Sequence, residues 1–467
     1  MSRPGVVLRW WVPDVALAAA CVTLFYCLFL FQGYQQLFRD SDAGWHIRTG
    51  EAILATGTLP RTDPYSFTRG GQPWFAWEWL TDTATGAIHR SAGLSGVALF
   101  YGAAIAIGVW LWFRLHWALG GNFLLACGMA PLLLSTCNIH WLARPHILSW
   151  IFLLLCLFPR RPNLLVVAAV TALWANTHAS FFLAPLIALV FALQDRWYLK
   201  AAAVAAVAPL LNPYGPKLYL HVFRYLTDND LLSRIGEFQS FDFHVAGAAQ
   251  ILAAVILGMI GATLALTQKR VHHFALGVLI TAMALRSARA LPLCALLLLP
   301  IANAAVTEWL GALDSTAGFL KYSSNLRAQD GRFHGLALAP LLLWAAYCLM
   351  PAARFPADQF PVAAYTHIPA EARLFAPDKF GGYLIYRSNG TRKVFFDGRS
   401  DLYGAEFLKQ YQRLVQVRPG WRERFDAYGF THALLQNDAP LLPALEQIGW
   451  RRLYQDKTAT LLAFPGT

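Results

Sequence analysis

Charged residues are scarce in this sequence. Asp, Glu, Lys and Arg make up 14% of its 467 residues, and hydrophobic residues make up 57%. A soluble globular domain usually carries about 25% charged residues. The deficit lies between about Val15 and Met350, in apolar runs too long and too numerous for a water-soluble core. This composition excludes a soluble enzyme, a disordered chain and a disulfide-linked secreted domain, and it predicts a polytopic membrane protein.

Cysteine is missing from the polar stretches. The seven cysteines all lie in or beside apolar segments. These positions give neither a zinc-binding spacing nor a disulfide framework. We therefore expect the cysteines to pack as small apolar residues.

Eleven apolar segments are candidates for membrane-spanning helices, because a helix needs about 20 apolar residues to cross the hydrocarbon core. They are residues 14–34, 95–113, 121–138, 146–158, 163–175, 179–193, 199–211, 247–267, 273–286, 289–306 and 334–350. The first follows Arg3 and Arg9 and has features of a signal peptide. It is longer than the usual apolar core of about 7–15 residues, so we expect an uncleaved first span.

Basic residues in the short loops predict the orientation of these spans. Arg3 and Arg9 place the N-terminus on the cytoplasmic side. Every second loop after them also carries Lys or Arg: Arg114, Arg160 with Arg161, Arg196 with Lys200, Lys269 with Arg270, and Lys321 with Arg327. Eleven spans therefore predict a cytoplasmic N-terminus and an extracytoplasmic C-terminus.

The segment 163–193 is too long for one crossing and short for two. One interpretation is two short helices that meet at Asn176-Thr-His178, below the outer membrane surface. Such an interruption is tolerated where the backbone lines a protein cavity rather than lipid. The alternative is ordinary helix tilt.

The loop 35–93 on the outer side holds two carboxylates, Asp40 and Asp42, directly after the first span. Acids in this position suit a metal ion or a polar substrate at the membrane surface. A carboxylate there is also a candidate general base toward a hydroxyl group. Trp45 and the later tryptophans of the loop either anchor it at the interface or stack on a sugar.

Arg286 and Arg289 follow a span that is too short to reach the outer interface. A charge at membrane depth costs about 2.5–3.5 kcal/mol on insertion scales. We therefore expect the pair to face a wet cavity or an anion, with snorkelling to the headgroups as the alternative. Their i,i+3 spacing predicts that both lie on one helical face.

Two stretches of the first loop resemble a known family. Asp40-Ser-Asp42-Ala-Gly-Trp45-His46-Ile-Arg48 resembles the acidic motif and following aromatic and arginine residues of oligosaccharyltransferase catalytic subunits. Residues 73–80 are similar in position to the Pro-and-Trp segment of protein mannosyltransferases and aminoarabinose transferases. The chain thus resembles the C-type (GT-C) integral membrane glycosyltransferases.

The whole chain also resembles a large group of bacterial membrane proteins. The shared elements are Asp63-Pro64-Tyr65-Ser66, Asn176-Thr-His178, Asn212-Pro213-Tyr214-Gly215 and Asp397-Gly398-Arg399. This second likeness supports the architecture and names no substrate.

The GT-C resemblance implies an all-α polytopic membrane domain over residues 1–352, with about 11 transmembrane helices. Within it, 35–93 is the first extracytoplasmic loop, and Glu78 to Ser91 forms a surface helix before the second span. Residues 353–467 then form a small extracytoplasmic α/β domain. The location implied is the bacterial inner membrane.

The activity implied is that of an inverting glycosyltransferase. It moves a sugar from a polyprenyl-phosphate-linked donor to an acceptor hydroxyl of a lipid, glycan or protein on the outer face. Asp42 is the expected base or metal ligand, with Asp40 beside it, and Arg286 and Arg289 are expected to hold the donor phosphate. Further candidates for substrate binding are Trp45, His46, Arg48, Glu78, Arg144, His146, Asn176 and His178.

A divalent cation, Mg²⁺ or Mn²⁺, is a possible cofactor held by Asp40 and Asp42. The sequence departs from the family in two places: it lacks the WWD-type acceptor motif of oligosaccharyltransferases and the adjacent Asp-Glu pair of mannosyltransferases. The other classes considered are a non-enzymatic transporter or flippase of lipid-linked glycans and an envelope assembly protein. The dispersed basic residues exclude a nucleic-acid recognition module, and the net charge of +12 fits contact with anionic membrane lipids.

The C-terminal part has mixed polar composition and predicts strands and helices in alternation. Strands are expected at 383–386, 393–396, 431–435 and 460–464, and helices at 407–415 and 441–447. Asp397-Gly398-Arg399-Ser400-Asp401 would follow a strand, where ligand-binding loops commonly lie. A tight turn closed by a salt bridge is the alternative.

Overall fold

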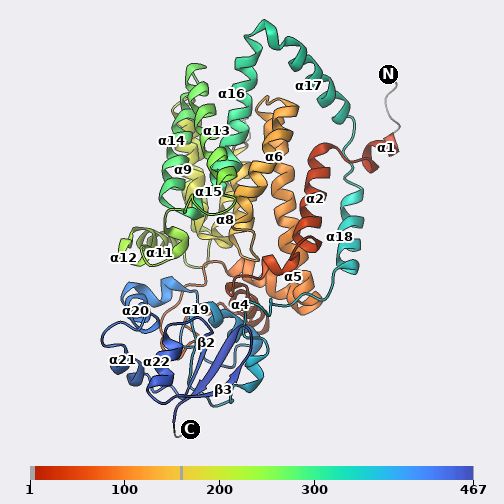
Figure 1. Cartoon of the computed structure of the whole chain (residues 1–467). Helices are drawn as coiled ribbons and strands as arrows, with labels where there is room; N and C mark the ends of the chain where they lie inside the picture. Colours follow the sequence, from red (N-terminus) through yellow and green to blue (C-terminus); the bar gives the residue numbers. More distant parts are fainter. Residues whose placement is uncertain (1–5, 158–160, 466–467) are drawn as a thin grey trace.

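The computed structural model describes residues 6–157 and 161–465 of the chain. A bundle of helices makes up most of it, and a smaller C-terminal part caps one end of the bundle (Figure 1). Arg3 and Arg160, two of the basic residues behind the predicted orientation, lie outside the described residues.

Eleven apolar helical segments coincide with the eleven predicted ones. Four of them are long and apolar enough to cross a membrane: Leu8–Phe29, Trp79–Ala118, Ala248–Thr267 and Ala288–Gly311. The shorter ones are Phe123–Asn138, His146–Leu155, Leu164–Thr177, Ala179–Ala192, Tyr198–Leu210, Val271–Arg286 and Leu338–Leu349. The apolar helices are confirmed in the described part of the chain, and eleven complete crossings remain a prediction.

The four long segments correspond to the following elements. They are α1 (Val6–Trp11) with α2 (Val15–Phe29), α5 (Trp79–Ala118), α13 (Ala248–Thr267), and the run η4 (Ala288–Ala290), α15 (Leu291–Leu293), η5 (Cys294–Leu298) and α16 (Leu299–Gly311). The shorter ones are α6 (Phe123–Asn138), α7 (His146–Leu155), α8 (Leu164–Thr177), η1 (Ala179–Phe182) with α9 (Leu183–Ala192), α10 (Tyr198–Val207) with η2 (Ala208–Leu210), α14 (Val271–Arg286) and α18 (Leu338–Leu349).

The remaining helices of this part lie in the connections. They are α3 (Tyr34–Leu37), α4 (Asp42–Thr56), α11 (Pro216–Thr227), α12 (Asn229–Leu232), η3 (Gly236–Phe238), η6 (Asp314–Thr316) and α17 (Ala317–Asp330). α17 and the turn between α13 and α14 lie at the end of the bundle opposite the C-terminal part (Figure 1). This end carries Lys269, Arg270, Lys321 and Arg327, so these basic residues share one end as predicted.

The interruption predicted at Asn176-Thr-His178 is confirmed. His178 is extended (φ −162°, ψ 148°) between α8 and η1. Its Nδ1 accepts a hydrogen bond from the backbone N–H of Ser180 at 3.2 Å, so the side chain caps the next helix. The side chain of Asn176 donates to the carbonyl of Leu211 at 2.9 Å, which ties the break to the end of η2.

Glycine contacts fix the first loop against the bundle. The helix expected from Glu78 to Ser91 forms the first part of α5, which bends at Gly93 (φ 60°, ψ −161°) and continues into the second predicted span. α4 packs on this first part through Gly50 and Gly86. A Cβ on Gly50 would lie 1.7 Å from the carbonyl oxygen of Asp82, so the two helices touch backbone to backbone.

The C-terminal part holds a four-stranded sheet of order β1-β2-β4-β3. Its strands are β1 (Leu374–Phe375), β2 (His432–Gln436), β3 (Arg451–Gln455) and β4 (Ala459–Ala463). β1 runs parallel to β2, and β4 is antiparallel to both β2 and β3, with His432 opposite Ala463. The helices of this part are η7 (Ala364–His367), α19 (Asp378–Arg387), α20 (Ser400–Val415), α21 (Trp421–Ala427) and α22 (Leu441–Gln447).

Two predicted strands are wrong, while the strands at 431–435 and 460–464 and both predicted helices are confirmed. Residues 383–386 belong to α19, whose buried Phe380, Tyr383 and Leu384 have helical spacing. Residues 393–396 form a single bridge, from Val394 to Ser66, and otherwise extend without a ladder. Both segments are short apolar runs, in which periodicity does not separate a strand from a buried helix.

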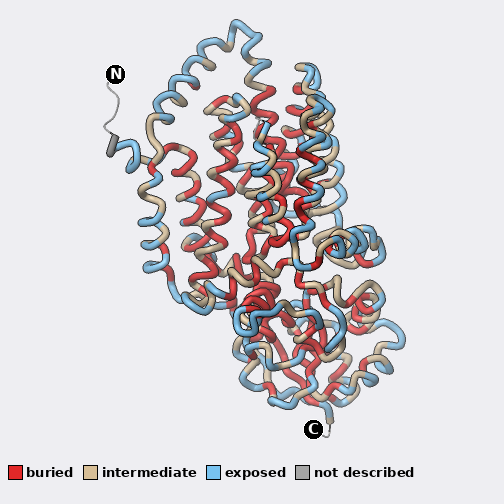
Figure 2. The backbone as a smooth tube through the Cα atoms, turned by 180° about the vertical axis from the view of Figure 1, so that it is seen from behind, coloured by how far each residue is buried: buried red, intermediate tan, exposed pale blue. Residues whose placement is uncertain are grey.

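One cluster of buried apolar residues spans both parts of the molecule, and a second lies mainly in the C-terminal part. Buried residues run from the helices through α4 and α19 to the sheet (Figure 2). Gly44 and Gly382 allow a close approach of the two backbones, because a Cβ on Gly44 would lie 2.2 Å from the carbonyl oxygen of Gly382. The C-terminal part is therefore seated directly on the helix that begins with Asp42.

Candidate active site

A cavity of about 1300 Å³ lies between the bundle and the C-terminal part. Nine of the twelve residues singled out in the sequence line it: Asp40, Asp42, Trp45, Glu78, Arg144, His146, His178, Arg286 and Arg289. Tertiary structure thus gathers residues from four separate polar stretches around one space.

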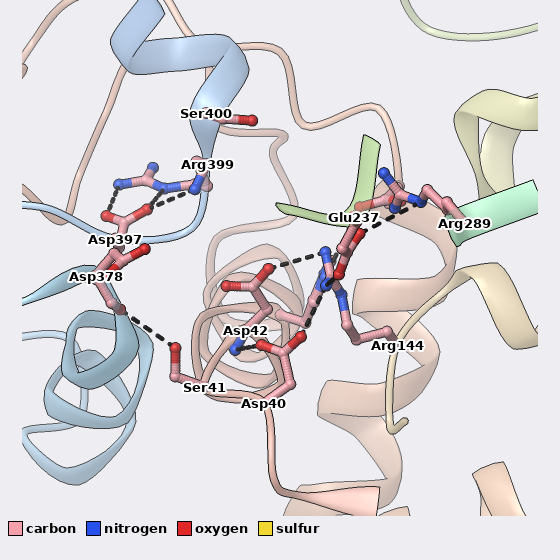
Figure 3. Close-up of polar contacts among 12 residues, drawn as sticks. Asp40, Ser41, Asp42, Arg144, Glu237, Arg289, Asp378, Asp397, Arg399 and Ser400 are labelled. Atoms are coloured by element: carbon pink, nitrogen blue, oxygen red, sulfur yellow. Dashed lines mark hydrogen bonds and ion pairs between the residues drawn. The ribbon is translucent and has the colours of Figure 1, made fainter. Parts of the chain in front are cut away.

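Asp40, Asp42 and Arg144 form an ion-pair cluster at the wall of this cavity (Figure 3). One terminal nitrogen of Arg144 lies 2.8 Å from Asp40 Oδ2, and the other lies 2.9 Å from Asp42 Oδ2. The first nitrogen also lies 3.0 Å from Glu237 Oε1. A single guanidinium therefore joins three carboxylates.

Local structure explains why these groups meet. Asp42 is the first residue of α4, and its backbone N–H donates to Asp40 Oδ1 at 2.9 Å, so the two acids are held by one turn. Arg144 lies in the loop that leads into α7. This loop is fixed by a hydrogen bond from Ala143 N–H to the carbonyl of Leu37 at 2.8 Å, and Pro145 precedes the first residue of α7.

Asp42 has the properties of a base near neutral pH. Its side chain is 7% exposed. Burial raises the pKa of Asp42 to about 7, and the Arg144 guanidinium opposes part of this rise. A carboxyl group with this pKa is half ionised near neutrality, which suits proton abstraction from a hydroxyl group.

Glu237 links the cluster to Arg289. Arg289 Nε lies 3.5 Å from Glu237 Oε2, and its guanidinium lies 5.3 Å from the centre of the Phe238 ring. Burial raises the pKa of Glu237, but Arg289 and Arg144 more than offset it and hold the pKa well below its ordinary value. Glu237 is therefore a stable anion between two arginines.

Arg286 and Arg289 do not share one helical face, so that prediction is wrong. α14 ends at Arg286, and Ser287 is extended (φ −143°, ψ 125°) before Arg289 in η4. Both side chains still line the cavity. A terminal nitrogen of Arg286 lies 3.3 Å from Asn229 Oδ1, whereas Arg289 faces Glu237.

A second acidic group lies deeper in the cavity. Glu78 Oε1 is 3.5 Å from His178 Nε2, and Glu78 Oε2 is 3.8 Å from His46 Nε2. His46 Nδ1 is 2.6 Å from Asp82 Oδ1. Burial raises the pKa of Glu78 to about 7. This histidine–carboxylate network extends the polar surface from Asp42 toward α8.

Three sequence candidates do not line the cavity. His46 lies behind it in the network just described. Arg48 turns away and donates to the carbonyl of Tyr386 at 2.7 and 2.9 Å. Asn176 accepts a hydrogen bond from Trp79 Nε1 at 2.8 Å and stabilises the break between the helices. These three residues support the walls of the site rather than its interior.

Glu237 and Asp82 are not among the site residues expected from the sequence. Glu237 lies in a long loop and belongs to no motif. Because it is far from Arg144 in the sequence, no local pattern indicated their contact. Asp82 lies one turn after Glu78 on α5, and this i,i+4 spacing was the available signal.

The segment Asp397–Asp401 forms a salt-bridged turn at the cavity, and its role in ligand binding stays a prediction. Arg399 pairs with Asp397 through two hydrogen bonds of 2.8 and 2.7 Å and also lies 2.8 Å from Asp63 Oδ1, which confirms the salt-bridged turn. Gly398 and Ser400 line the cavity as well. A Cβ on Gly398 would lie 2.0 Å from Asp42 Oδ1, so the C-terminal part touches the candidate base.

Replacing Gly398 with Ala is expected to displace the Asp42 carboxylate while leaving the fold intact. The added methyl group overlaps Asp42 Oδ1, and the carboxylate has to rotate away from Arg144. A misplaced catalytic group of this kind costs on the order of 10²-fold in rate. The measurement is the turnover rate of each variant beside its thermal unfolding. Gly128→Ala in α6, where a Cβ meets nothing within 4 Å, is the control; equal activity of both variants would contradict the contact.

The positive partner of the acids at this site is an arginine. In the described part of the chain, no group of three or more His, Cys, Asp or Glu side chains is arranged to hold a metal ion. Asp40 and Asp42, the metal ligands expected from sequence, both face the Arg144 guanidinium.

Comparisons with known proteins identify the fold. No family model matches the sequence, and no curated protein sequence matches it. A crystal structure of the Archaeoglobus fulgidus oligosaccharyltransferase, tethered through a disulfide bond to an acceptor peptide containing the NVT sequon, is similar with a TM-score of 0.55 and 11% identity. It covers 90% of this chain and 68% of that one. The apo form gives a TM-score of 0.55 and 12% identity, covering 90% and 69%. The chain therefore has a fold similar to that of this oligosaccharyltransferase.

Proposed function

We propose that the chain is an inverting membrane glycosyltransferase. It transfers a sugar from a polyprenyl-phosphate-linked donor to an acceptor hydroxyl on the outer face of the bacterial inner membrane. The observation that carries the proposal is the buried carboxylate of Asp42, which has a raised pKa and lies in a cavity that also holds Arg286 and Arg289.

The lining of the cavity supports a lipid-linked donor. It includes arginines as well as Leu153, Trp174, Phe182 and Leu183 from the apolar helices. A phosphate pairs well with guanidinium groups, and an isoprenoid chain is stabilised by apolar surface. A donor with a phosphate and an apolar tail would match both kinds of lining residue.

The proposed reaction is a single displacement. The acceptor oxygen attacks the anomeric carbon and forms the new C–O bond, while the bond from that carbon to the phosphate oxygen breaks. Asp42 takes the acceptor proton, and the polyprenyl phosphate leaves with the electron pair. Arg289 stabilises the charge on the leaving phosphate. The acceptor would enter beside Gly398 and Ser400, from the C-terminal part.

Release of free polyprenyl phosphate tests this proposal. Purified protein in proteoliposomes, supplied with a polyprenyl-phosphate-linked labelled sugar and envelope glycan as acceptor, is expected to release the lipid phosphate. Arg289→Gln should raise the KM for the donor about 10- to 100-fold, because a hydrogen bond to a charged group contributes about 1.5–3 kcal/mol. Lipid and product are measured by thin-layer chromatography.

Arg270→Gln is the matched control, because Arg270 pairs with Glu308 at the opposite end of the bundle and should leave the KM unchanged. Movement of intact labelled donor across the bilayer without cleavage would replace the proposal with a flippase. Unchanged envelope glycans and lipid-linked sugars in a deletion strain would exclude the transferase.

A further inference from the structure

Three carboxylates from two distant segments surround one positive group of the chain itself, the guanidinium of Arg144. Asp40 lies just before α4, Asp42 is the first residue of α4, and Glu237 lies in η3. All three have an oxygen within 3.0 Å of an Arg144 nitrogen. Buried like charges repel strongly, so a cluster of this kind requires a positive partner at its centre.

Five of the six oxygens of the three carboxylates have a polar partner, and the sixth, Asp42 Oδ1, lies against Gly398. Asp40 Oδ1 accepts the Asp42 N–H, and Asp40 Oδ2 faces Arg144. Asp42 Oδ2 also faces Arg144, and Asp42 Oδ1 packs against the backbone of Gly398. Glu237 Oε1 faces Arg144, and Glu237 Oε2 faces Arg289.

A divalent cation and this guanidinium compete for the same place. Mg²⁺ requires an octahedron of oxygen ligands at about 2.0–2.1 Å. The Arg144 nitrogens lie 2.8, 2.9 and 3.0 Å from the carboxylate oxygens, in the space such an ion would fill. Figure 3 shows the Arg144 side chain reaching in between the carboxylates of Asp42, Asp40 and Glu237.

Arg144 is also firmly held in this position. Its loop is tied to α3 by the Ala143–Leu37 hydrogen bond, and its side chain is 15% exposed. A guanidinium stays protonated at every physiological pH, and its planar fork matches several carboxylates at once. The cluster thus has a permanent positive charge that needs no ion from solution.

We infer that Arg144 takes the place of a divalent cation in the cluster of Asp40, Asp42 and Glu237. The site therefore positions its base without a metal ion. Arg144 is a positioning residue: it orients the Asp42 carboxylate toward the cavity and balances the charge of its neighbours. The role of Arg144 in catalysis rests on the proposed function. Its position among the three carboxylates, in place of a cation, does not.

Binding of Mn²⁺ to the full-length chain in detergent tests the inference. The wild-type protein is expected to leave the electron paramagnetic resonance signal of aqueous Mn²⁺ unchanged, and EDTA should not alter its unfolding temperature. Arg144→Met removes the internal cation and leaves three acids facing one another. This variant is expected to bind stoichiometric Mn²⁺, to quench the aqueous signal, and to unfold at a higher temperature when Mn²⁺ is present.

Adding Asp42→Asn to Arg144→Met should weaken Mn²⁺ binding by at least about tenfold, because a charged ligand is lost. Stoichiometric Mn²⁺ binding by the wild-type chain that is lost in Asp42→Asn would overturn the inference, and so would a folded Arg144→Met variant that binds no Mn²⁺. If Arg144→Met does not fold, the wild-type measurement still decides. The assay uses no sugar donor, so its result is independent of whether the chain transfers glycans.

Discussion

Asp42→Asn is expected to lower the transfer rate by about 10²–10⁴-fold, the usual contribution of a general base. The amide has the size of the carboxylate and can still accept a hydrogen bond from Arg144, so folding and donor binding should remain close to wild type. It cannot take the proton of the acceptor hydroxyl. The measurement is the turnover of a labelled polyprenyl-phosphate sugar beside a donor-binding assay. Asp242→Asn is the control, because the Asp242 side chain is exposed and does not line the cavity.

The wild-type rate should also depend on pH with a defined sign. Asp42 works as a base only when ionised, and its pKa is raised to about 7. The rate is therefore expected to be full above this pH and to fall as the pH drops through about 7. Glu78 also has a pKa of about 7, so Glu78→Gln separates the two groups. A profile that stays flat from neutral to acidic pH in wild type would contradict a role for Asp42 as base.

Arg399→Met is expected to destabilise the folded protein by about 3–5 kcal/mol, the cost of stranding buried charges by removing their partner. Arg399 is 2% exposed, and it pairs with Asp397 and Asp63, which are themselves buried. Burial lowers the pKa of Arg399, but Asp397 and Asp63 more than offset this effect and hold it above its ordinary value. The check is unfolding in detergent, followed by near-ultraviolet circular dichroism.

A control variant compares the loss of a buried ion pair with the loss of an exposed one. Arg452→Met removes the exposed pair with Glu446 and should change stability by no more than about 1 kcal/mol. Adding Asp397→Asn to Arg399→Met removes one stranded charge and should recover part of the lost stability. If Arg399→Met and Arg452→Met unfold alike, Arg399 does not hold the C-terminal part against the first loop.

Much of the fold was accessible from sequence because apolar length and short-range spacing control it. The eleven apolar helices, the break at His178, α22, β2 and β4 all follow from runs or periodicities within about 20 residues. The error at 383–386 has the same origin. The apolar run is consistent with both a strand and a buried helix, and only packing against α4 through Gly382 and Gly44 selects the helix.

Part of the candidate site was accessible in the same way. Asp40, Asp42, Arg144 and Arg289 were predictable because charged residues are costly near a membrane and so few are present. Their pairing was not predictable. Asp42 and Arg144 are about one hundred residues apart, and Glu237 lies as far again along the chain, so no local pattern connects them.

The sequence alone determined that this chain is apolar and helical, with its acids and arginines restricted to a few polar stretches, because solvation makes buried charge expensive at every position. Only the tertiary structure decided what those charges do. It placed a guanidinium where sequence suggested a metal ion, and it placed Gly398 against Asp42. Both outcomes depend on contacts between distant segments. Arg144 reaches Asp40 from the loop before α7, and Gly398 reaches Asp42 because the C-terminal part packs on α4.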